Sequence, residues 1–351
     1  MSGVRHALPI LAIALACALV AGCDRPAPSR HEQRRLMMGS FGSVTAYAAD
    51  ASVDAVLVAA LDEMQRVDTL MSHYKPDSEV SRISAMAGAG SVRVQEDTLH
   101  VVTAALDMGR ETCGAFDITV APLLKLWGCF SHGARVPSAT EVEATRADVG
   151  LDGLRVDQDA MVVMLMRERM ELDLGGIAKG YAVDQAARAL RVGGVRSALV
   201  NLSNSAFRAV GSPPGEDQWR IAVSHPRAPG EQLGVVLISD VALATSADTE
   251  QFFVHEGVRY GHIMDPRTGY PVSNGVVSVT VVAPTGLEAD ALATAVFVLG
   301  PDDGMRLIGE RPRTSALVVT EEADGRLKLH VSEGMRERFL PSQVEERSER
   351  P

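Results

Sequence analysis

The sequence predicts an α+β fold in which mixed or antiparallel sheets pack against helices. Short β-rich runs dominate from residue 154 onward, and predicted helices over residues 176–191 and 288–299 separate only some of them. Because strands and helices do not alternate regularly as βαβ units do, the pattern does not favour a doubly wound parallel sheet. The chain has 351 residues and is 46% hydrophobic, enough for one large domain or two ordinary ones with a sizeable core.

The remaining elements follow from local patterns. A strand is expected at residues 43–48, and Leu57, Leu61 and Met64 at helical spacing indicate a helix over residues 54–71. A polar loop at 72–81 and a second helix at 97–112 come next. Later strands are expected over residues 161–165, 171–174, 197–202, 219–224, 234–238 and 276–283.

The N-terminus has the layout of an export signal. Arg5 precedes an apolar run over residues 7–20 that is too short to span a membrane comfortably, and small residues lead into Cys23. This is typical of a bacterial lipoprotein, so we expect a lipid on Cys23 to anchor the protein at the periplasmic face of the inner membrane. Ordinary secretion with cleavage nearby, or an uncleaved anchor, are the alternatives.

These patterns divide the chain into four parts. We expect a signal peptide at residues 1–22, a tether at 23–36, one domain at 37–335 and a charged, disordered tail at 336–351. Cys113 and Cys129 are the only mature cysteines besides Cys23. An exported protein permits a disulfide between them, and the sequence leaves their state open.

Composition excludes one class of function. The net charge of −11 argues against a general polyanion binder, and an aromatic content of only 4% makes a nucleic-acid stacking surface a poor interpretation. No nucleic-acid partner is therefore expected. Any phosphate ligand must be held by a local site or by a metal ion.

A strand–glycine–helix corner around Gly175 and Gly176 is the first candidate site. An apolar strand is expected to end at Leu174, and a helical pattern starts after the two glycines. Such a corner aims backbone N–H groups and the positive end of a helix at one point, and Lys179 adds a mobile charge. Since the spacing matches neither common phosphate-binding motif, a plain tight corner is an equally simple interpretation.

Asp290 and Thr294 form a second candidate. They are four residues apart, so a helix places both side chains on one face. Hard oxygen ligands one turn apart suit Mg²⁺ or Ca²⁺. The alternative is that Asp290 only answers the helix dipole in a first turn, while Thr294 bonds the preceding turn.

A turn at residues 265–269 is the third candidate. Asp265-Pro266 followed by Gly269 is a turn signal in its own right. His262 stands before the turn and Arg267 inside it, so the two can serve a phosphate or the edge of a flavin ring. Polar clusters at residues 245–250 and 201–205 follow expected strands, where ligand loops often lie.

Several of these stretches occur in an order that resembles the ApbE family, the FAD:protein FMN transferases. The resemblance covers residues 37 to about 320. The matching stretches are Met38-Gly39-Ser40, Tyr74-x-Pro76-x-Ser78-Glu79-Val80-Ser81, Gly114-x-Phe116-Asp117-Ile118-Thr119-Val120-x-Pro122-Leu123, Asp173-Leu174-Gly175-Gly176-Ile177-Ala178-Lys179-Gly180, His262-Ile263-Met264-Asp265-Pro266-Arg267-Thr268-Gly269 and Ala289-Asp290-Ala291-Leu292-x-Thr294.

The resemblance implies a central FAD cleft and transfer of the FMN half of FAD, with loss of AMP, to a threonine hydroxyl. The acceptors would be subunits of membrane flavin redox complexes. A divalent metal, Mg²⁺ with Ca²⁺ or Mn²⁺ as alternatives, would be held by the backbone oxygen of Gly176 and by Asp290 and Thr294. The FAD-binding residues would be Met38, Tyr74, Ala115, Phe116, Asp117, Asp173, Lys179 and His262.

Two residues are the candidates for the chemistry itself. A threonine hydroxyl needs a base, or a nearby metal, to become a nucleophile. We favour Asp290 for the metal and His262 for positioning phosphate or moving a proton. The chain departs from the family at Ser40, at Ser203-Asn204, where the family often has two glycines, and at Ala247, none of which removes a predicted metal ligand.

Other functions use the same residues. A metal-dependent FAD pyrophosphatase would release FMN and AMP into solution, and a periplasmic FAD carrier would bind FAD without turnover. A purely structural glycine corner would bind no flavin. The products formed from FAD, with and without an acceptor, distinguish these possibilities.

Overall fold

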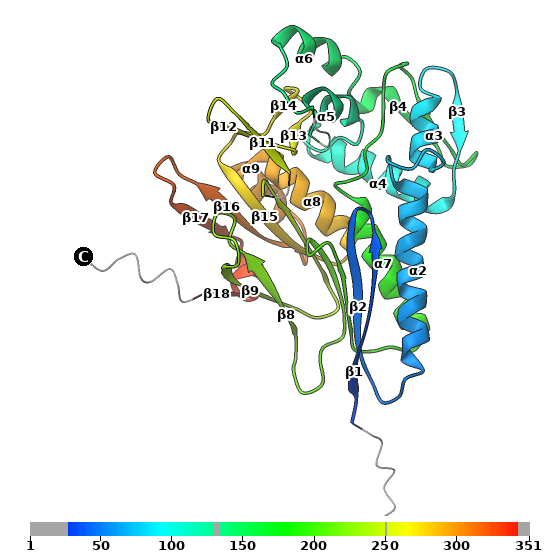
Figure 1. Cartoon of the computed structure of the whole chain (residues 1–351), viewed down its shortest axis with the longest axis vertical. Helices are drawn as coiled ribbons and strands as arrows, with labels where there is room; N and C mark the ends of the chain where they lie inside the picture. The colour runs from blue at the N-terminus through cyan, green and yellow to red at the C-terminus, as the bar shows by residue number, and fades with distance from the viewer. Residues whose placement is uncertain (1–26, 130–132, 250, 343–351) are drawn as a thin grey trace, which may run out of the picture.

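An eight-stranded antiparallel sheet is the largest element of the computed structural model, which describes residues 27–129, 133–249 and 251–342 (Figure 1). Every neighbouring pair in this sheet is antiparallel, which agrees with the prediction of an α+β fold with mixed or antiparallel sheets. Its strands, in spatial order, are β1 (Ser29–Met37), β2 (Ser40–Ala48), β6 (Ala198–Leu202), β7 (Ala206–Val210), β10 (Ala242–Ala247), β15 (Val276–Ala283), β16 (Ser315–Glu321) and β17 (Leu327–Val331).

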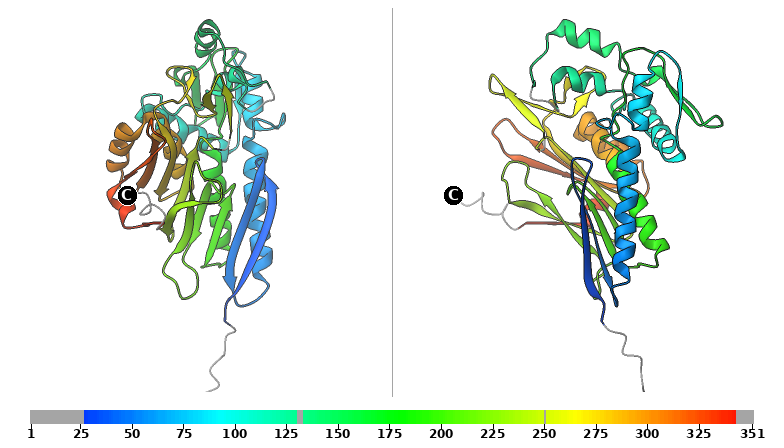
Figure 2. Two further views of the ribbon diagram at one scale, coloured as in Figure 1. Left: turned by 60° about the vertical axis from the view of Figure 1, so that its left-hand side comes forward. Right: turned by 45° about the vertical axis from the view of Figure 1, so that its right-hand side comes forward.

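Helices cover one face of this sheet (Figure 2). They are α2 (Val53–Met71), α7 (Ala178–Val192), α8 (Gly286–Leu299) and α9 (Pro301–Gly309). Strand side chains alternate between the faces, so Ala242 and Ala244 of β10 pack into the helix-side core while Leu243 packs on the other side. This alternation decides which later residues of β10 face α8.

A small sheet covers part of the opposite face. It consists of β8 (Trp219–Ser224), β9 (Gln232–Ile238) and β18 (Phe339–Pro341), with the short helix α10 (Glu333–Arg336) beside it. Trp219, Val236 and Phe339 pack there against Leu243 of the large sheet. The large sheet is therefore buried on both faces, which explains why all eight residues of β15 are buried.

A third group of elements lies at one end of the large sheet (Figures 1 and 2). Trp127 anchors it, because its indole Nε1 donates to the carbonyl of Gly269 at 3.0 Å and its ring packs on Met264. The group comprises α3 (Glu79–Ala85), β3 (Ser91–Arg93), α4 (Glu96–Glu111), α5 (Ala121–Trp127), α6 (Ala139–Arg146), the 3-10 helix η2 (Leu151–Gly153), β4 (Leu154–Asp157), β5 (Val162–Leu165), β11 (Phe252–His255), β12 (Val258–Gly261), β13 (Met264–Asp265) and β14 (Tyr270–Pro271).

Two segments expected to be irregular are ordered. Residues from Ser29 onward, predicted as part of the 23–36 tether, form β1, whose nine residues all pair with β2. The strand β1 was not predicted because its sequence is mostly polar, as is common for an edge strand. Residues 339–341, predicted as part of a disordered tail, form β18 because Phe339 is buried in the second core. The predicted signal peptide, Cys23 and residues 343–351 lie outside the described residues.

Three other local expectations also differ from the structure. Residues 171–174 form no strand, since a single bridge joins Glu171 to Val120 and the residues are otherwise held as a buried loop. The predicted loop at 72–81 contains the start of α3, whose N-cap Ser78 accepts from the backbone N–H of Ser81 at 3.0 Å. The strand β10 continues through Ala247 into the predicted 245–250 loop.

The described residues include Cys113, Cys129 and the helices from α2 to α10. Cys113 and Cys129 are both free thiols, and burial raises the pKa of Cys129 to about 11. Among the described helices, none combines the length and the apolar character that a membrane crossing requires.

Asp97 of α4 links this helix to α2 and α7. Its carboxylate accepts from both terminal nitrogens of Arg66 in α2, at 2.8 and 2.9 Å, and from the hydroxyl of Tyr181 in α7, at 2.5 Å. The Arg66 guanidinium lowers the pKa of Asp97 most; partial burial raises it, the Tyr181 hydroxyl lowers it again, and the net direction is down.

Replacing Asp97 with asparagine is expected to lower the free energy of unfolding at pH 7 by about 1–2 kcal/mol. A depressed pKa stabilises the fold above the unfolded pKa near 3.9, and this contribution is lost as pH falls through the folded value. The difference in the free energy of unfolding between the wild type and Asp97→Asn should therefore become smaller below about pH 4. Denaturant unfolding at pH 7 and pH 3 measures it. Asp107→Asn, which breaks an exposed pair with Arg110 on the same helix, is the matched control; equal losses for the two variants would contradict the prediction.

Candidate functional site

The glycine corner lies against α8. Helix α7 begins at Ala178, with Ile177 as its N-cap. A Cβ atom on Gly176 would lie 3.0 Å from Thr294 Oγ1 and 3.3 Å from the Phe116 ring. Gly176 has no positive φ, so it is a glycine because of this close approach rather than because of turn geometry.

Asp290 lies one helical turn from Thr294 and also meets the start of α7. The backbone N–H of Gly180 donates to Asp290 Oδ2 at 2.9 Å, and Asp290 is only 4% exposed. Helix α8 begins at Gly286, two residues earlier than expected, so Asp290 is beyond its first turn. Its position is therefore not explained by the dipole of its own helix, which was the alternative.

The N-terminus of α8 is bound instead by α7 and by its own cap. Asp184 accepts from the backbone N–H groups of Gly286 and Leu287 at 2.8 and 3.0 Å, and Thr285 Oγ1 accepts from Glu288 N. Burial raises the pKa of Asp184, and these hydrogen bonds oppose that shift. A carboxylate of each helix therefore binds backbone N–H groups in the first turn of the other: Asp290 of α8 at the start of α7, and Asp184 of α7 at the start of α8.

Gly176, Asp290 and Thr294 make an oxygen-only set. A backbone carbonyl, one carboxylate and one hydroxyl match the hard ligands that Mg²⁺ and Ca²⁺ prefer. Among the described residues no group of three or more His, Cys, Asp or Glu could hold a metal ion. A cation at this set would therefore depend on a single protein carboxylate and on ligand oxygens, which is the usual arrangement for Mg²⁺ with a phosphate substrate.

Ser246 belongs to the polar cluster at residues 245–250, but its contact with Thr294 was not predicted from the sequence. Its Oγ lies 3.2 Å from Thr294 Oγ1, reaching it from the end of β10. The signal was present in the alternation along β10, because Ser246 continues the helix-facing series of Ala242 and Ala244. The contact was not predicted because residues 245–250 were interpreted as a loop, whereas β10 extends through Ala247.

The segment 115–117 passes the same corner. Ala115, Phe116 and Asp117 are all buried, and Phe116 contacts Gly176 as described. Asp117 Oδ1 accepts from the backbone N–H and the hydroxyl of Thr119, at 2.7 and 2.6 Å. Burial raises the pKa of Asp117, and the two Thr119 hydrogen bonds act against that rise.

Asp173 links the corner to an aromatic pair. It accepts from Gly175 N at 2.6 Å and pairs with His73 Nδ1 at 3.2 Å. The His73 ring lies 3.8 Å from that of Tyr74, whose pKa is raised by burial and by the Asp173 charge. His73, Tyr74 and Asp173 line one edge of a cavity of about 910 Å³. His73 was missed because a loop histidine has no periodic signal.

Two predicted FAD-binding residues, Lys179 and Met38, lie at the start of α7 and in the turn between β1 and β2. Lys179, in the first turn of α7, is half-buried, and its side chain has no hydrogen bond or ion pair with any residue that the structure describes. Met38 (φ 48°) and Gly39 (φ 71°) form the two-residue turn of the β1–β2 hairpin. A cation left without a carboxylate partner at a helix N-terminus is suited to an anionic ligand.

The β6–β7 turn contains Ser203 and Asn204, where this chain departs from the two glycines frequent in the family. Ser203 and Asn204 have φ values of 64° and 54°, the left-handed region that glycine adopts most easily. Asn201 Oδ1 accepts from the Asn204 backbone N–H at 3.0 Å and supports the turn. Ser203 N also donates to the carbonyl of Phe41, so the β1–β2 and β6–β7 hairpins adjoin.

The carbonyl of Gln251 contacts His262 at two points. Both its backbone N–H and its ring Nδ1 lie 3.1 Å from the carbonyl oxygen of Gln251. Since a carbonyl only accepts, Nδ1 carries the proton and Nε2 carries the lone pair of the neutral ring. The Arg267 side chain donates two hydrogen bonds to Asp265 within its own turn, at 2.9 and 2.8 Å. That His262 and Arg267 serve a phosphate or the edge of a flavin ring stays a prediction.

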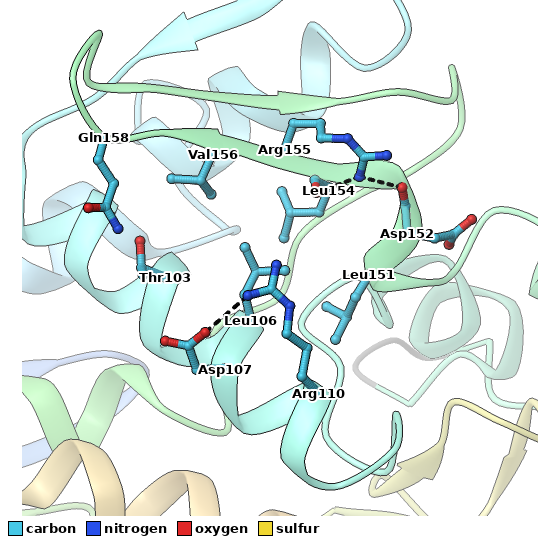
Figure 3. A pocket seen from close by; sticks show the side chains of 10 residues that line it. All are labelled: Thr103, Leu106, Asp107, Arg110, Leu151, Asp152, Leu154, Arg155, Val156 and Gln158. Atoms are coloured by element: carbon cyan, nitrogen blue, oxygen red, sulfur yellow. Dashed lines mark hydrogen bonds and ion pairs between the residues drawn. The ribbon is translucent and has the colours of Figure 1, made fainter.

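A second cavity, of about 490 Å³, lies between α4 and residues 151–158 (Figure 3). None of the predicted site residues lines it. Arg110 turns toward Asp107 on its own helix, and Arg155 donates to the carbonyl of Asp152 at 2.6 Å. Thr103 Oγ1, which also lines this cavity, is buried without a hydrogen-bond partner among the described residues.

Comparisons with known proteins agree with the resemblance. A sequence profile of the ApbE family matches residues 38–318. An FAD:protein FMN transferase of Vibrio cholerae is 34% identical over 312 residues, which cover 88% of this chain and 92% of the relative. A protein of the same name from Escherichia coli K12 is 31% identical over 331 residues, covering 90% and 93%.

Solved structures show the same fold. The ApbE protein of Thermotoga maritima superposes with a TM-score of 0.80 at 33% identity and covers 89% of this chain and 100% of its own. The flavin transferase ApbE of Vibrio cholerae gives 0.79 at 31% identity with the same coverage. Every predicted site residue, from Met38 to Thr294, lies within the matched range. The chain therefore belongs to the ApbE family.

Proposed function

We propose that this protein transfers the FMN moiety of FAD to a threonine hydroxyl of an acceptor protein, with Mg²⁺ as the metal and AMP as the leaving product. Its relatives are named FAD:protein FMN transferases. The observation that carries the proposal is the contact of the glycine corner with Asp290 and Thr294 at the N-terminus of α7. This contact combines an anion-binding helix end with a hard-oxygen metal set in one place.

The start of α7 is suited to the pyrophosphate of FAD. The positive end of its helix dipole favours negative charge. The backbone N–H groups of Ala178 and Gly180 already donate to the Leu174 carbonyl and to Asp290, so it is the dipole and Lys179 that favour an anion here. Lys179, without a carboxylate partner among the described residues, adds a full positive charge in a chain whose net charge is −11. We assign the rest of FAD to Met38, Tyr74, Ala115, Phe116, Asp117, Asp173 and His262.

The metal set is proposed to be the Gly176 carbonyl, Asp290 and Thr294. A divalent cation there would neutralise pyrophosphate oxygens and the charge that develops on departing AMP. Asp290 is held in position by the Gly180 N–H, and Thr294 by Ser246, so neither side chain has to be ordered at the moment of binding. Ca²⁺ or Mn²⁺ would satisfy the same hard-oxygen ligands.

His262 is proposed to handle the proton. The Gln251 carbonyl keeps the proton of the neutral ring on Nδ1, so Nε2 is the atom that accepts a proton from the acceptor threonine. The threonine oxygen then forms a bond to the FMN phosphorus, and the bond from that phosphorus to the AMP oxygen breaks. The protein's own contribution is positioning and charge stabilisation rather than covalent catalysis.

We further propose that the protein acts from the membrane surface at the periplasmic face, held by a lipid on Cys23. Cys23 precedes Ser29, the first residue of β1, by six positions, so an anchor there leaves a short link to the sheet. Subunits of membrane flavin redox complexes are then acceptors within reach. Recovery of radiolabelled, lipid-modified protein in the membrane fraction is expected for the wild type, and loss of both the label and the membrane association is expected for Cys23→Ala.

Incubating the protein with FAD, Mg²⁺ and an acceptor carrying a threonine in a small-residue motif tests the reaction. Mass spectrometry is expected to find FMN on the threonine, with an equimolar amount of AMP. Rapid formation of AMP and free FMN without acceptor would instead establish a pyrophosphatase. FAD binding without AMP release would establish a carrier.

A further inference from the structure

Ser246 lies where β10 reaches the metal-ligand face of α8. Residues 242 and 244 of this strand pack into the helix-side core, and 246 continues that face, so its hydroxyl points to α8. The result is the 3.2 Å contact between Ser246 Oγ and Thr294 Oγ1. Thr245, the preceding residue, faces the other way and pairs with Thr280 Oγ1 at 2.9 Å.

The polarity of this contact matters if Thr294 binds a cation. A hydroxyl that presents its oxygen lone pairs to a cation must direct its proton elsewhere. Ser246 Oγ can accept that proton. The two α8 side chains are then held in the same way by partners outside their helix, Asp290 by the Gly180 N–H and Thr294 by Ser246.

The end of β10 is held firmly in place. The backbone N–H of Asp248 donates to the Val277 carbonyl at 3.1 Å, and its carboxylate receives both terminal nitrogens of Arg227 at 2.8 Å. Arg227 also binds Glu321, at the end of β16. These contacts come two residues after Ser246 and restrict where its hydroxyl can lie.

We propose that Ser246 is a positioning residue for the metal, accepting the Thr294 proton so that Thr294 Oγ1 faces the cation. The inference rests on the proposed function, because it needs the cation that Gly176, Asp290 and Thr294 would hold. It adds a residue of β10 to a site otherwise built from the corner before α7 and from α8.

Binding of Mn²⁺ to the full chain in saturating FAD, followed by electron paramagnetic resonance, tests the role without relying on turnover. Ser246→Ala is expected to weaken Mn²⁺ binding about tenfold, as is common when a partner of a metal ligand is lost. Ser246→Thr keeps the hydroxyl and should restore binding. Thr245→Val, which removes a hydroxyl from the opposite face of the same strand, should bind as the wild type does.

The transfer rate gives a second measurement. Ser246→Ala should need about tenfold more Mn²⁺ for half-maximal transfer yet approach the wild-type rate at saturation, because it acts through Thr294. Wild-type Mn²⁺ affinity in Ser246→Ala, alongside loss of binding in Asp290→Ala, would overturn the role of Ser246 alone. Equal affinity in wild type and Asp290→Ala would overturn the proposed metal site itself.

Discussion

Replacing Asp290 with alanine is expected to lower the rate of flavin transfer at least about a hundredfold while the fold survives. Asp290 supplies the single carboxylate of the proposed metal set, and metal stabilisation of transferred phosphate charge is worth several kcal/mol. The lost side chain also leaves the Gly180 N–H without its 2.9 Å partner. That N–H belongs to the first turn of α7, so the structural cost should be limited to about 1–2 kcal/mol.

Asp290→Asn separates the two effects. An asparagine oxygen can still accept from the Gly180 N–H, so this variant should unfold close to the wild-type denaturant midpoint. Its neutral amide is a poorer ligand for a hard cation, so most of the rate should still be lost. Steady-state transfer assays and unfolding curves on both variants provide the comparison. Near-full transfer by the wild type in excess chelator would rule out a metal requirement.

Part of this site could be predicted from local sequence alone. The four-residue spacing of Asp290 and Thr294 predicts a shared helix face, and α8 provides it. The approach of Gly176 to that face could not be predicted locally, because it depends on how α7 and α8 cross. Ser246 and His73 were missed for related reasons, since each is recognisable only from what lies opposite it in space.

The elements of the fold also fall into those that local sequence predicts and those that depend on contacts with a distant segment. Periodic apolar stretches predicted α2, α4 and β15 within one or two residues of their observed bounds. The misses were segments whose structure depends on a neighbour: β1 is a polar edge strand that exists by pairing with β2, and residues 171–174 are apolar without being a strand. Leu172 and Leu174 are buried in the core as a loop, which alternation alone cannot distinguish from a strand.

The helix crossing that assembles the site depends on two glycines, Gly180 in α7 and Gly286 in α8. A Cβ atom on Gly180 would lie 2.0 Å from the carbonyl oxygen of Gly286 and 2.7 Å from Asp290 Cβ. A Cβ atom on Gly286 would lie 2.3 Å from the carbonyl oxygen of Gly180. The obstructing atoms are mainly backbone, which cannot move aside as a flexible side chain can, so any added methyl group must push the helices apart.

Gly180→Ala is therefore expected to destabilise the protein by about 2–3 kcal/mol or more and to weaken metal binding, because separating the helices lengthens the bond from Gly180 N to Asp290. Helix propensity acts in the opposite direction, but alanine gains only about 1 kcal/mol over glycine there. Gly309→Ala is the control, since Gly309 is also a helical glycine, the last residue of α9, and a Cβ atom on it would meet nothing within 4 Å. Denaturant unfolding should show Gly309→Ala as neutral or slightly stabilised. If Gly180→Ala unfolded at the wild-type midpoint and bound Mn²⁺ as tightly, close contact of α7 and α8 would not be what places Asp290 beside the corner.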